Sequence, residues 1–156
     1  MCIRDRENCP YTHCPKGLMT KDIVERTGSP NLKMLWDPAN SYRADRHRVP
    51  PEFLGSSLRE ELLECLPYIG YVHVKDYHYD PEAEGKKFRH EALGKGDIDF
   101  REIAEILREK KDGCMLSIEP EVMTREEILE SLRYYREAVS YTHLDVYKRQ
   151  MWKWMM

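Results

Sequence analysis

Short apolar runs alternate along the chain with longer stretches of helical spacing. Three runs, "NLKMLWDPAN", "YIGYVHVKDY" and "DGCMLSIEPE", are bounded by Gly, Pro or Asn and are too short for a helix, so each predicts a strand. Elsewhere apolar residues recur every three or four positions, which predicts helices. The helical positions are Leu58, Leu62 and Leu66; Phe100, Ile103, Ala104 and Leu107; and Ile128, Leu132 and Tyr135.

A shorter helix is predicted over "MTKDIVERTG", with Thr20 as its N-cap and Gly28 as its stop. The predicted order is then helix, strand, helix, strand, helix, strand, helix. Alternation of this kind is typical of repeated βα units, whose strands lie parallel in one sheet. The pattern therefore predicts the α/β fold class.

Each predicted strand carries a charged or metal-binding side chain where its apolar run ends. These residues are Asp37, His73 and Glu119. In a (β/α) barrel the carboxyl ends of the strands carry the active site, whereas the opposite edge serves stability. The three residues are therefore candidates for one site.

Side chains of a strand alternate between its two faces, which divides the middle strand into two sets. One set is Tyr71, His73 and Lys75, and we expect it to face the interior of a barrel. The other set is Val72, Val74 and Asp76.

The two ends of the chain follow neither pattern. Back-translation of residues 145–150, Asp-Val-Tyr-Lys-Arg-Gln, gives the DNA string GATGTGTATAAGAGACAG, and a shifted frame of that string gives residues 1–5. The string resembles a transposon end used in preparing sequencing libraries. We interpret residues 1–6 and 139–156 as adapter-derived and residues 7–138 as the domain.

Composition narrows the function further. The chain has a net charge of −3 and no basic stripe, and removing the two end segments makes it more acidic, so we expect no nucleic-acid partner. No apolar run is long enough to span a membrane, and the N-terminus lacks a signal peptide. The cysteines outside the end segments form no compact disulfide pattern, which favours a reducing, cytoplasmic setting.

Five motifs occur in a particular order: "ENCP", "LWDPAN", "YVHVKD", "LGKGDIDF" and "LSIEPE". In that order they resemble the second half of the xylose-isomerase-like superfamily of sugar phosphate isomerases and epimerases. The resemblance implies the C-terminal half of a (β/α)8 TIM barrel, strands five to eight with their helices. It also implies that the parent protein is a full barrel, expected to be a homo-oligomer, and that this truncated chain has little or no activity.

The resemblance implies that Glu7, Asp37, His73 and Glu119 bind one divalent metal ion. Three carboxylates and one imidazole favour Mn²⁺, Mg²⁺ or Co²⁺, although Zn²⁺ is possible. The family's reaction moves a proton beside a carbonyl or hydroxyl carbon through an enediolate, and this chemistry needs a carboxylate on each side of the carbon. Glu7 and Glu119 are the candidate bases.

The expected ligand is a small sugar or sugar phosphate. Lys75, which shares a face with His73, is a candidate contact for a substrate oxygen or phosphate, and Trp36 and Asn40 are further candidates for substrate binding. Trp36 has a second interpretation, in which it packs beneath the rim of the barrel.

Several other functions have to be weighed. An inositol-type dehydratase or a hydroxypyruvate-like isomerase on the same barrel cannot be separated from an epimerase by sequence, and an inactive half barrel is a third alternative. An abasic-site endonuclease fits less well, because Asn40 stands where that class has a histidine three residues after Asp37. The group Cys9, His13 and Cys14 has no second pair at zinc-finger spacing, so we interpret it as a loop.

Overall fold

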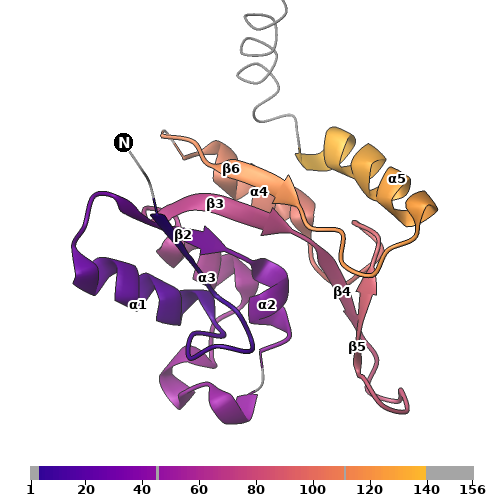
Figure 1. Cartoon of the computed structure of the whole chain (residues 1–156), viewed down its shortest axis with the longest axis horizontal. Helices are drawn as coiled ribbons and strands as arrows, with labels where there is room; N and C mark the ends of the chain where they lie inside the picture. The colour runs from indigo at the N-terminus through magenta and orange to yellow at the C-terminus, as the bar shows by residue number, and fades with distance from the viewer. Residues whose placement is uncertain (1–3, 45, 111, 140–156) are drawn as a thin grey trace, which may run out of the picture.

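The computed structural model describes residues 4–44, 46–110 and 112–139, and a parallel four-stranded sheet forms its centre (Figure 1). The strand order is β1-β2-β3-β6, and every neighbouring pair is parallel. This confirms the predicted α/β class with parallel strands. The strands are β1 (Arg4–Glu7), β2 (Leu32–Trp36), β3 (Ile69–Val74) and β6 (Met115–Ile118).

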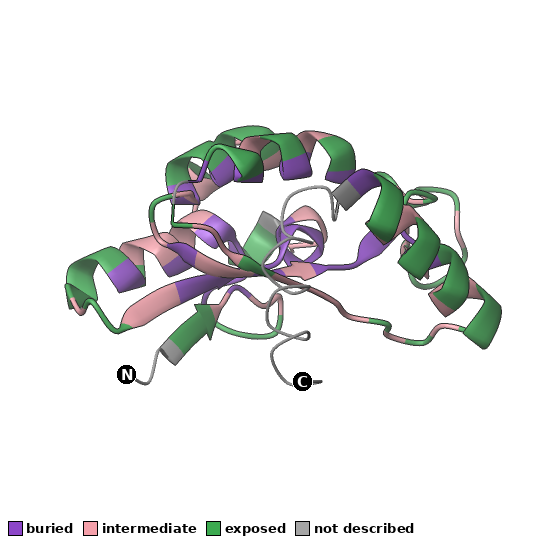
Figure 2. Cartoon of the chain, turned by 90° about the horizontal axis from the view of Figure 1, so that it is seen from above, coloured by how far each residue is buried: buried purple, intermediate pink, exposed green. Residues whose placement is uncertain are grey.

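Helices cover one face of this sheet and turn their buried side toward it (Figure 2). The core between the two layers contains Met34, Val72, Phe100 and Leu107, each at most 1% exposed. The helices are α1 (Gly17–Thr27), α2 (Pro38–Tyr42), α3 (Leu58–Cys65), α4 (Phe100–Arg108) and α5 (Arg125–Tyr134), with short turns at η1 (Arg46–Arg48), η2 (Pro51–Phe53) and η3 (Tyr135–Val139).

Strand β1 begins within the segment that we interpreted as adapter-derived. Residues 4–6, which we interpreted as adapter-derived, pair with β2 in the register Arg4↔Leu32 to Glu7↔Leu35. An outer strand needs only its backbone groups to join a ladder, so the polar sequence RDRE does not prevent pairing. Most of the C-terminal segment interpreted in the same way lies outside the described residues.

The start of α1 differs from the prediction, whereas its end agrees with it. The helix begins at Gly17 with Lys16 as its N-cap, so the prediction of Thr20 as the cap was wrong, and Thr20 lies fully buried inside the helix. Tertiary contacts extend the helix, because the Gly17 N–H donates a hydrogen bond to Ser41 Oγ. Gly28 ends it in the left-handed conformation, with φ of 61°.

An antiparallel hairpin follows β3 and was not predicted. It consists of β4 (Asp76–Tyr79) and β5 (Phe88–Glu91), and it projects from the carboxyl edge of the sheet (Figure 1). Asp76 lies fully buried at its base. Its carboxylate accepts hydrogen bonds from the backbone N–H groups of Gly94, Gly96 and Ile98, and so holds the "LGKGD" loop that leads into α4.

Among the described residues, no helix is long and apolar enough to cross a membrane.

Candidate metal centre

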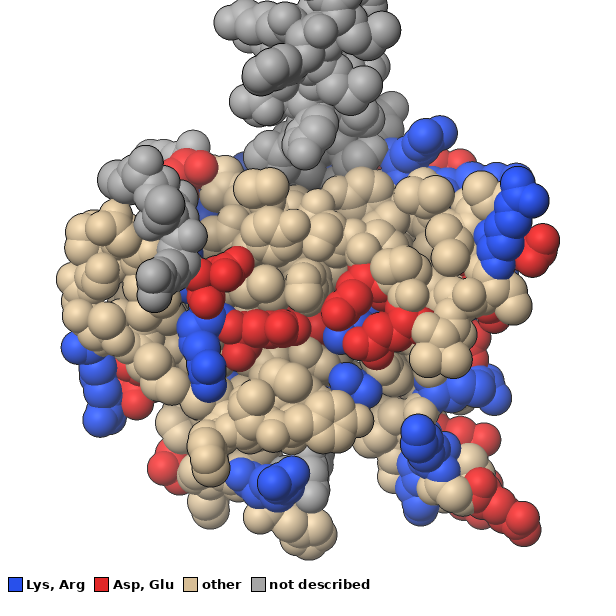
Figure 3. Space-filling view, viewed as in Figure 1, with Lys and Arg blue, Asp and Glu red and all other residues tan. Residues whose placement is uncertain are grey.

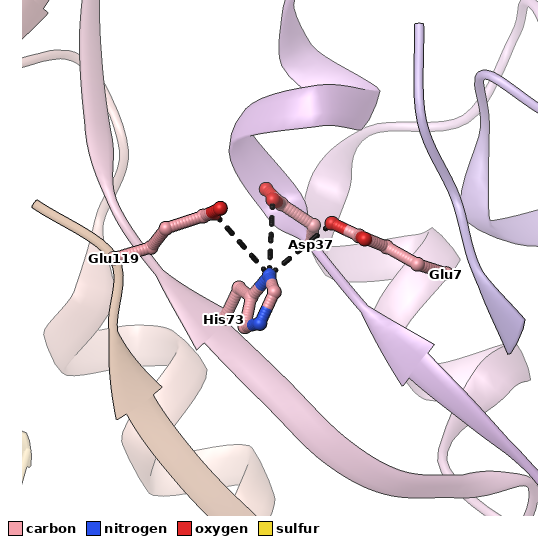
Figure 4. A group of neighbouring side chains, drawn as sticks. All are labelled: Glu7, Asp37, His73 and Glu119. Atoms are coloured by element: carbon pink, nitrogen blue, oxygen red, sulfur yellow. Dashed lines mark hydrogen bonds and ion pairs between the residues drawn. The ribbon is translucent and has the colours of Figure 1, made fainter. Parts of the chain in front are cut away.

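Four side chains meet at the carboxyl edge of the sheet, one from each parallel strand (Figure 4). Glu7 ends β1, Asp37 follows β2, His73 lies in β3 and Glu119 follows β6. Each offers a ligand atom, and these atoms all lie within 4.8 Å of one another. The structure thus brings together the four residues that the resemblance implied.

His73 lies between the three carboxylates. Its Nδ1 atom is 3.2 Å from Glu7 Oε1, 3.2 Å from Glu119 Oε2 and 3.8 Å from Asp37 Oδ2. Asp37 and Glu7 raise the pKa of His73 to about 10, against the opposing effect of burial. The ring is therefore protonated at neutral pH and supplies positive charge to an acidic cluster.

Lys75 is the second source of positive charge, and it is only 3% exposed. Its Nζ atom lies 2.6 Å from Glu119 Oε2, 2.9 Å from Asp37 Oδ2 and 3.5 Å from Glu121 Oε1. Burial alone would lower the pKa of Lys75, but Asp37 and Glu119 outweigh it and raise the pKa above its usual value. Figure 3 shows acidic side chains gathered across this face with basic atoms between them.

The two carboxylate oxygens of Asp37 have different surroundings. Oδ1 accepts a hydrogen bond of 2.9 Å from the Asn40 N–H and so caps helix α2, whose first residue is Pro38. Oδ2 is buried beside the Lys75 ammonium but accepts no hydrogen bond. The local sequence Asp-Pro-Ala-Asn thereby aims one oxygen into the helix and the other into the site.

These residues fit a divalent cation. Three oxygen donors and one nitrogen suit a hard ion, and Asp37 Oδ2, which is buried and accepts no hydrogen bond, lies at the cluster beside the Lys75 ammonium. The Asp37 side chain is 0% exposed, whereas those of Glu7 and Glu119 are 34% and 33% exposed. The cluster therefore has a closed side and a side open to a ligand.

Two of the other predicted residues are buried. Asn40, 1% exposed, donates through Nδ2 to Glu7 Oε1 at 3.2 Å and thus helps to orient that carboxylate. Trp36 is 0% exposed, and its Nε1–H donates a hydrogen bond of 2.8 Å to Glu61. The structure does not bring Trp36 to the site, because it precedes Asp37 by one residue and points to the helix-covered face.

Sequence reasoning missed a group of side chains beside the cluster. The Arg43 Nη1 group donates to the Tyr77 hydroxyl at 2.9 Å, and that hydroxyl donates to Glu121 at 3.2 Å. The acid pair in "EPE" was a signal for Glu121, but Arg43 and Tyr77 occur in no motif that would mark them. Cys9 and Cys14 lie in the loop between β1 and α1, as expected.

A parallel α/β sheet with its candidate site at the carboxyl edge of the strands is the arrangement found in (β/α) barrels. Residues 7–139 match the xylose isomerase-like TIM barrel family, and the chain belongs to it. No curated protein sequence matches the chain.

Several solved structures have the same fold. A xylose isomerase domain protein from Planctomyces limnophilus matches with 23% identity and a TM-score of 0.59, covering 85% of this chain and 43% of that protein. A xylose isomerase-like TIM barrel protein from Mycobacterium smegmatis, in complex with magnesium, has 18% identity and a TM-score of 0.64, covering 88% and 44%. An L-ribulose 3-epimerase has 15% identity and a TM-score of 0.61, covering 90% and 48%. The chain thus spans less than half the length of these relatives.

Proposed function

We propose that this chain is the metal-binding part of a divalent-metal-dependent isomerase or epimerase that acts on a sugar or sugar phosphate. The convergence of Glu7, Asp37, His73 and Glu119 within 4.8 Å carries the proposal. Solved structures of similar fold support the kind of reaction, since they include an L-ribulose 3-epimerase and a D-psicose 3-epimerase determined in the presence of D-fructose.

The two partly exposed carboxylates are the proposed acid and base. Glu7 and Glu119 approach His73 Nδ1 from opposite sides, each at 3.2 Å (Figure 4). One would remove a proton from the carbon beside a substrate carbonyl, and the other would return a proton from the opposite side of the resulting enediolate. A bound divalent ion would polarise the substrate oxygens and so make that carbon more acidic.

Lys75 has a supporting role in this proposal. Its ammonium lies 2.9 Å from Asp37 Oδ2 and 2.6 Å from Glu119 Oε2 and so holds these two carboxylates close together. A direct contact between Lys75 and a substrate oxygen is part of the same proposal, whereas Asn40 acts through its hydrogen bond to Glu7.

We also propose that the complete protein is a full barrel, of which this chain forms strands five to eight. The shares of 43% to 48% of the solved relatives support this proposal. In a complete barrel the remaining strands would form the other wall of the substrate pocket.

Mn²⁺ titration of the wild-type chain and of His73→Ala tests the metal site. We expect wild type to bind one ion and His73→Ala to lose most of that affinity. His78→Ala is a matched control, because His78 pairs with Asp97 at 2.8 Å outside the cluster, and it should bind as wild type does. Equal binding by His73→Ala and wild type would show that the assignment is wrong.

The reaction itself is tested with the complete protein. A panel of ketoses and ketose phosphates, followed by product analysis, distinguishes an epimer or isomer from a product that has lost water. Metal-dependent interconversion of sugars supports the proposal, and dehydration alone contradicts it.

A further inference from the structure

Asn8, the residue after Glu7, is fully buried and pairs with the backbone of Asp37. Its Oδ1 accepts a hydrogen bond of 2.8 Å from the Asp37 N–H, and its Nδ2 donates one of 2.8 Å to the Asp37 carbonyl. The backbone register between β1 and β2 ends at Glu7↔Leu35. The Asn8 side chain therefore continues the pairing where the backbone ladder stops.

Few side chains can make this pair of contacts. A carboxamide has a donor and an acceptor side by side, whereas an ionised carboxylate only accepts and an apolar side chain does neither. Loss of the amide would leave the buried N–H of Asp37 without its partner and the Asp37 C=O with only the Ser41 N–H, at 3.2 Å. The contact therefore fixes the backbone of a residue whose own side chain belongs to the metal centre.

Contacts with the helix layer hold the Asn8 side chain in place. Its Nδ2 also donates to Ser41 Oγ at 3.0 Å, and Ser41 Oγ accepts from the Gly17 N–H at 3.0 Å. The same hydroxyl donates to Glu61, which is fully buried and lies 3.2 Å from Lys16 Nζ. A chain of buried polar contacts thus runs from an ion pair among the helices to the edge of the metal centre.

The Asn8 backbone is connected to the second carboxylate. Its carbonyl accepts a hydrogen bond of 3.0 Å from Asn40 Nδ2, the same amide group that donates to Glu7 Oε1. Arg43 donates to Asn40 Oδ1 at 3.0 Å, which favours the orientation that points Nδ2 at Glu7. Asn8 is therefore connected to both residues. Its side chain binds the Asp37 backbone, and its carbonyl binds the Asn40 amide that donates to Glu7.

We propose that Asn8 is a positioning residue, which holds Glu7 and Asp37 at the separation that a divalent ion requires. This inference rests on the proposed function, because it presupposes that the four side chains bind a metal. Both polar ends of the Asn8 side chain are engaged by Asp37 and Ser41, so Asn8 acts through the two residues that it orders.

Mn²⁺ titration of Asn8→Ala tests the proposal, because groups that orient metal ligands typically change affinity by about 10–100-fold. We expect a loss of that size, together with faster hydrogen exchange at the Asp37 amide, a readout that does not depend on metal or activity. Ser131→Ala is the matched control. Ser131 lies in helix α5 and is buried like Asn8, and its hydroxyl accepts a hydrogen bond of 3.1 Å from the backbone N–H of Leu93. Its replacement should lower the melting temperature and leave Mn²⁺ affinity unchanged.

Asn8→Ser is the second variant, in case Asn8→Ala does not fold. A serine hydroxyl is shorter and cannot reach both backbone groups of Asp37, so Mn²⁺ affinity should still fall about tenfold or more. Affinity within twofold of wild type in either folded variant overturns the positioning role. Hydrogen exchange of the wild-type Asp37 amide as fast as that of an exposed loop amide also overturns the positioning role, and this measurement needs no variant. Failure of wild type to take up Mn²⁺ overturns the proposed function itself, and with it this inference.

Discussion

Lys75 Nζ donates a hydrogen bond of 2.6 Å to Glu119 Oε2 across the neighbouring strands β3 and β6. The same ammonium lies 2.9 Å from Asp37 Oδ2, so one buried cation neutralises two of the proposed metal ligands. A divalent ion would bring positive charge to the same oxygens. The effect of the Lys75 ammonium and the effect of a bound divalent ion should therefore depend on each other, because both act on the same carboxylates.

We expect Lys75→Met to destabilise the metal-free chain by about 3 kcal/mol, because it leaves Asp37 buried without its closest positive charge. The stabilisation that Mn²⁺ confers should then be larger than in wild type, since the ion replaces the missing charge. Thermal unfolding with and without Mn²⁺ measures both effects. Lys95→Met is the control. Lys95 is exposed and lies 3.6 Å from Glu130, so its replacement should change neither the stability of the metal-free chain nor the stabilisation by Mn²⁺. An unchanged Mn²⁺ effect in Lys75→Met would contradict the linkage.

The pH dependence of the site follows from His73, whose pKa is raised from 6.5 to about 10. A raised pKa in the folded chain gives stability that is fully present below pH 6.5 and is lost as the pH rises through about 10. A metal ion requires the neutral ring, so binding should release one proton. We expect Mn²⁺ affinity to rise about tenfold per pH unit between about pH 7 and 8.5.

Calorimetry in buffers of different ionisation enthalpy counts the proton that metal binding releases. His73→Ala, which has no ring to deprotonate, should lose this proton release along with most of its affinity. Binding by wild type with no proton exchanged would show that His73 is neutral or is not a ligand.

Asp76 provides a test of the fold that is independent of the metal. Its buried carboxylate accepts backbone hydrogen bonds from Tyr77, Gly94, Gly96 and Ile98. Asp76→Asn would turn an NH₂ group toward some of these N–H donors, so we expect a loss of about 2–4 kcal/mol in unfolding free energy.

Urea denaturation measures this loss, with Asp80→Asn as the control. The Asp80 carboxylate accepts one hydrogen bond, of 3.0 Å from the Glu82 N–H, in the exposed turn of the hairpin, so its replacement should cost about 0.5 kcal/mol or less. Equal stability of the two variants would mean that Asp76 does not hold the loop.

The outer strand β6 exposes Met115, which is 55% accessible to solvent, as expected for a strand face that lacks its neighbours. An outer strand with an exposed apolar side chain favours self-association. We expect the chain to run as a dimer or larger species in size-exclusion chromatography and Met115→Lys to shift it toward monomer. Val122→Lys, at a loop residue 99% exposed, is the control and should have no effect. A monomeric wild-type chain would rule out this association.

The sheet and the ligand cluster could be predicted because each depends on a repeated pattern. Apolar runs mark strands, and strand ends carry Asp37, His73 and Glu119, which parallel pairing must bring to one edge. Strand β1 lacks such a run, and the hairpin strands DYHY and FRHE show no clear alternation, so neither was predicted.

Other features depend on partners that are distant in the sequence. The start of α1 is set by contacts with Ser41 and Glu61, which override the capping preference of Thr20. The role of Asn8 is visible only when Asp37, 29 residues away, is known to lie beside it. Local pattern contains no information about such pairs.

The placement of one ligand on each of four strands has a consequence for folding. Glu7 ends β1 and Glu119 directly follows β6, the two outer strands of the sheet, which are also far apart in the sequence. An ion held by both would close this edge of the sheet, and because the separated ligands of the unfolded chain form no site, its binding free energy would stabilise only the folded arrangement. The four-residue β1, an outer strand with the polar sequence RDRE, would be held against fraying by that closure. Binding of the ion at the metal centre would then indicate that all four strands are in place.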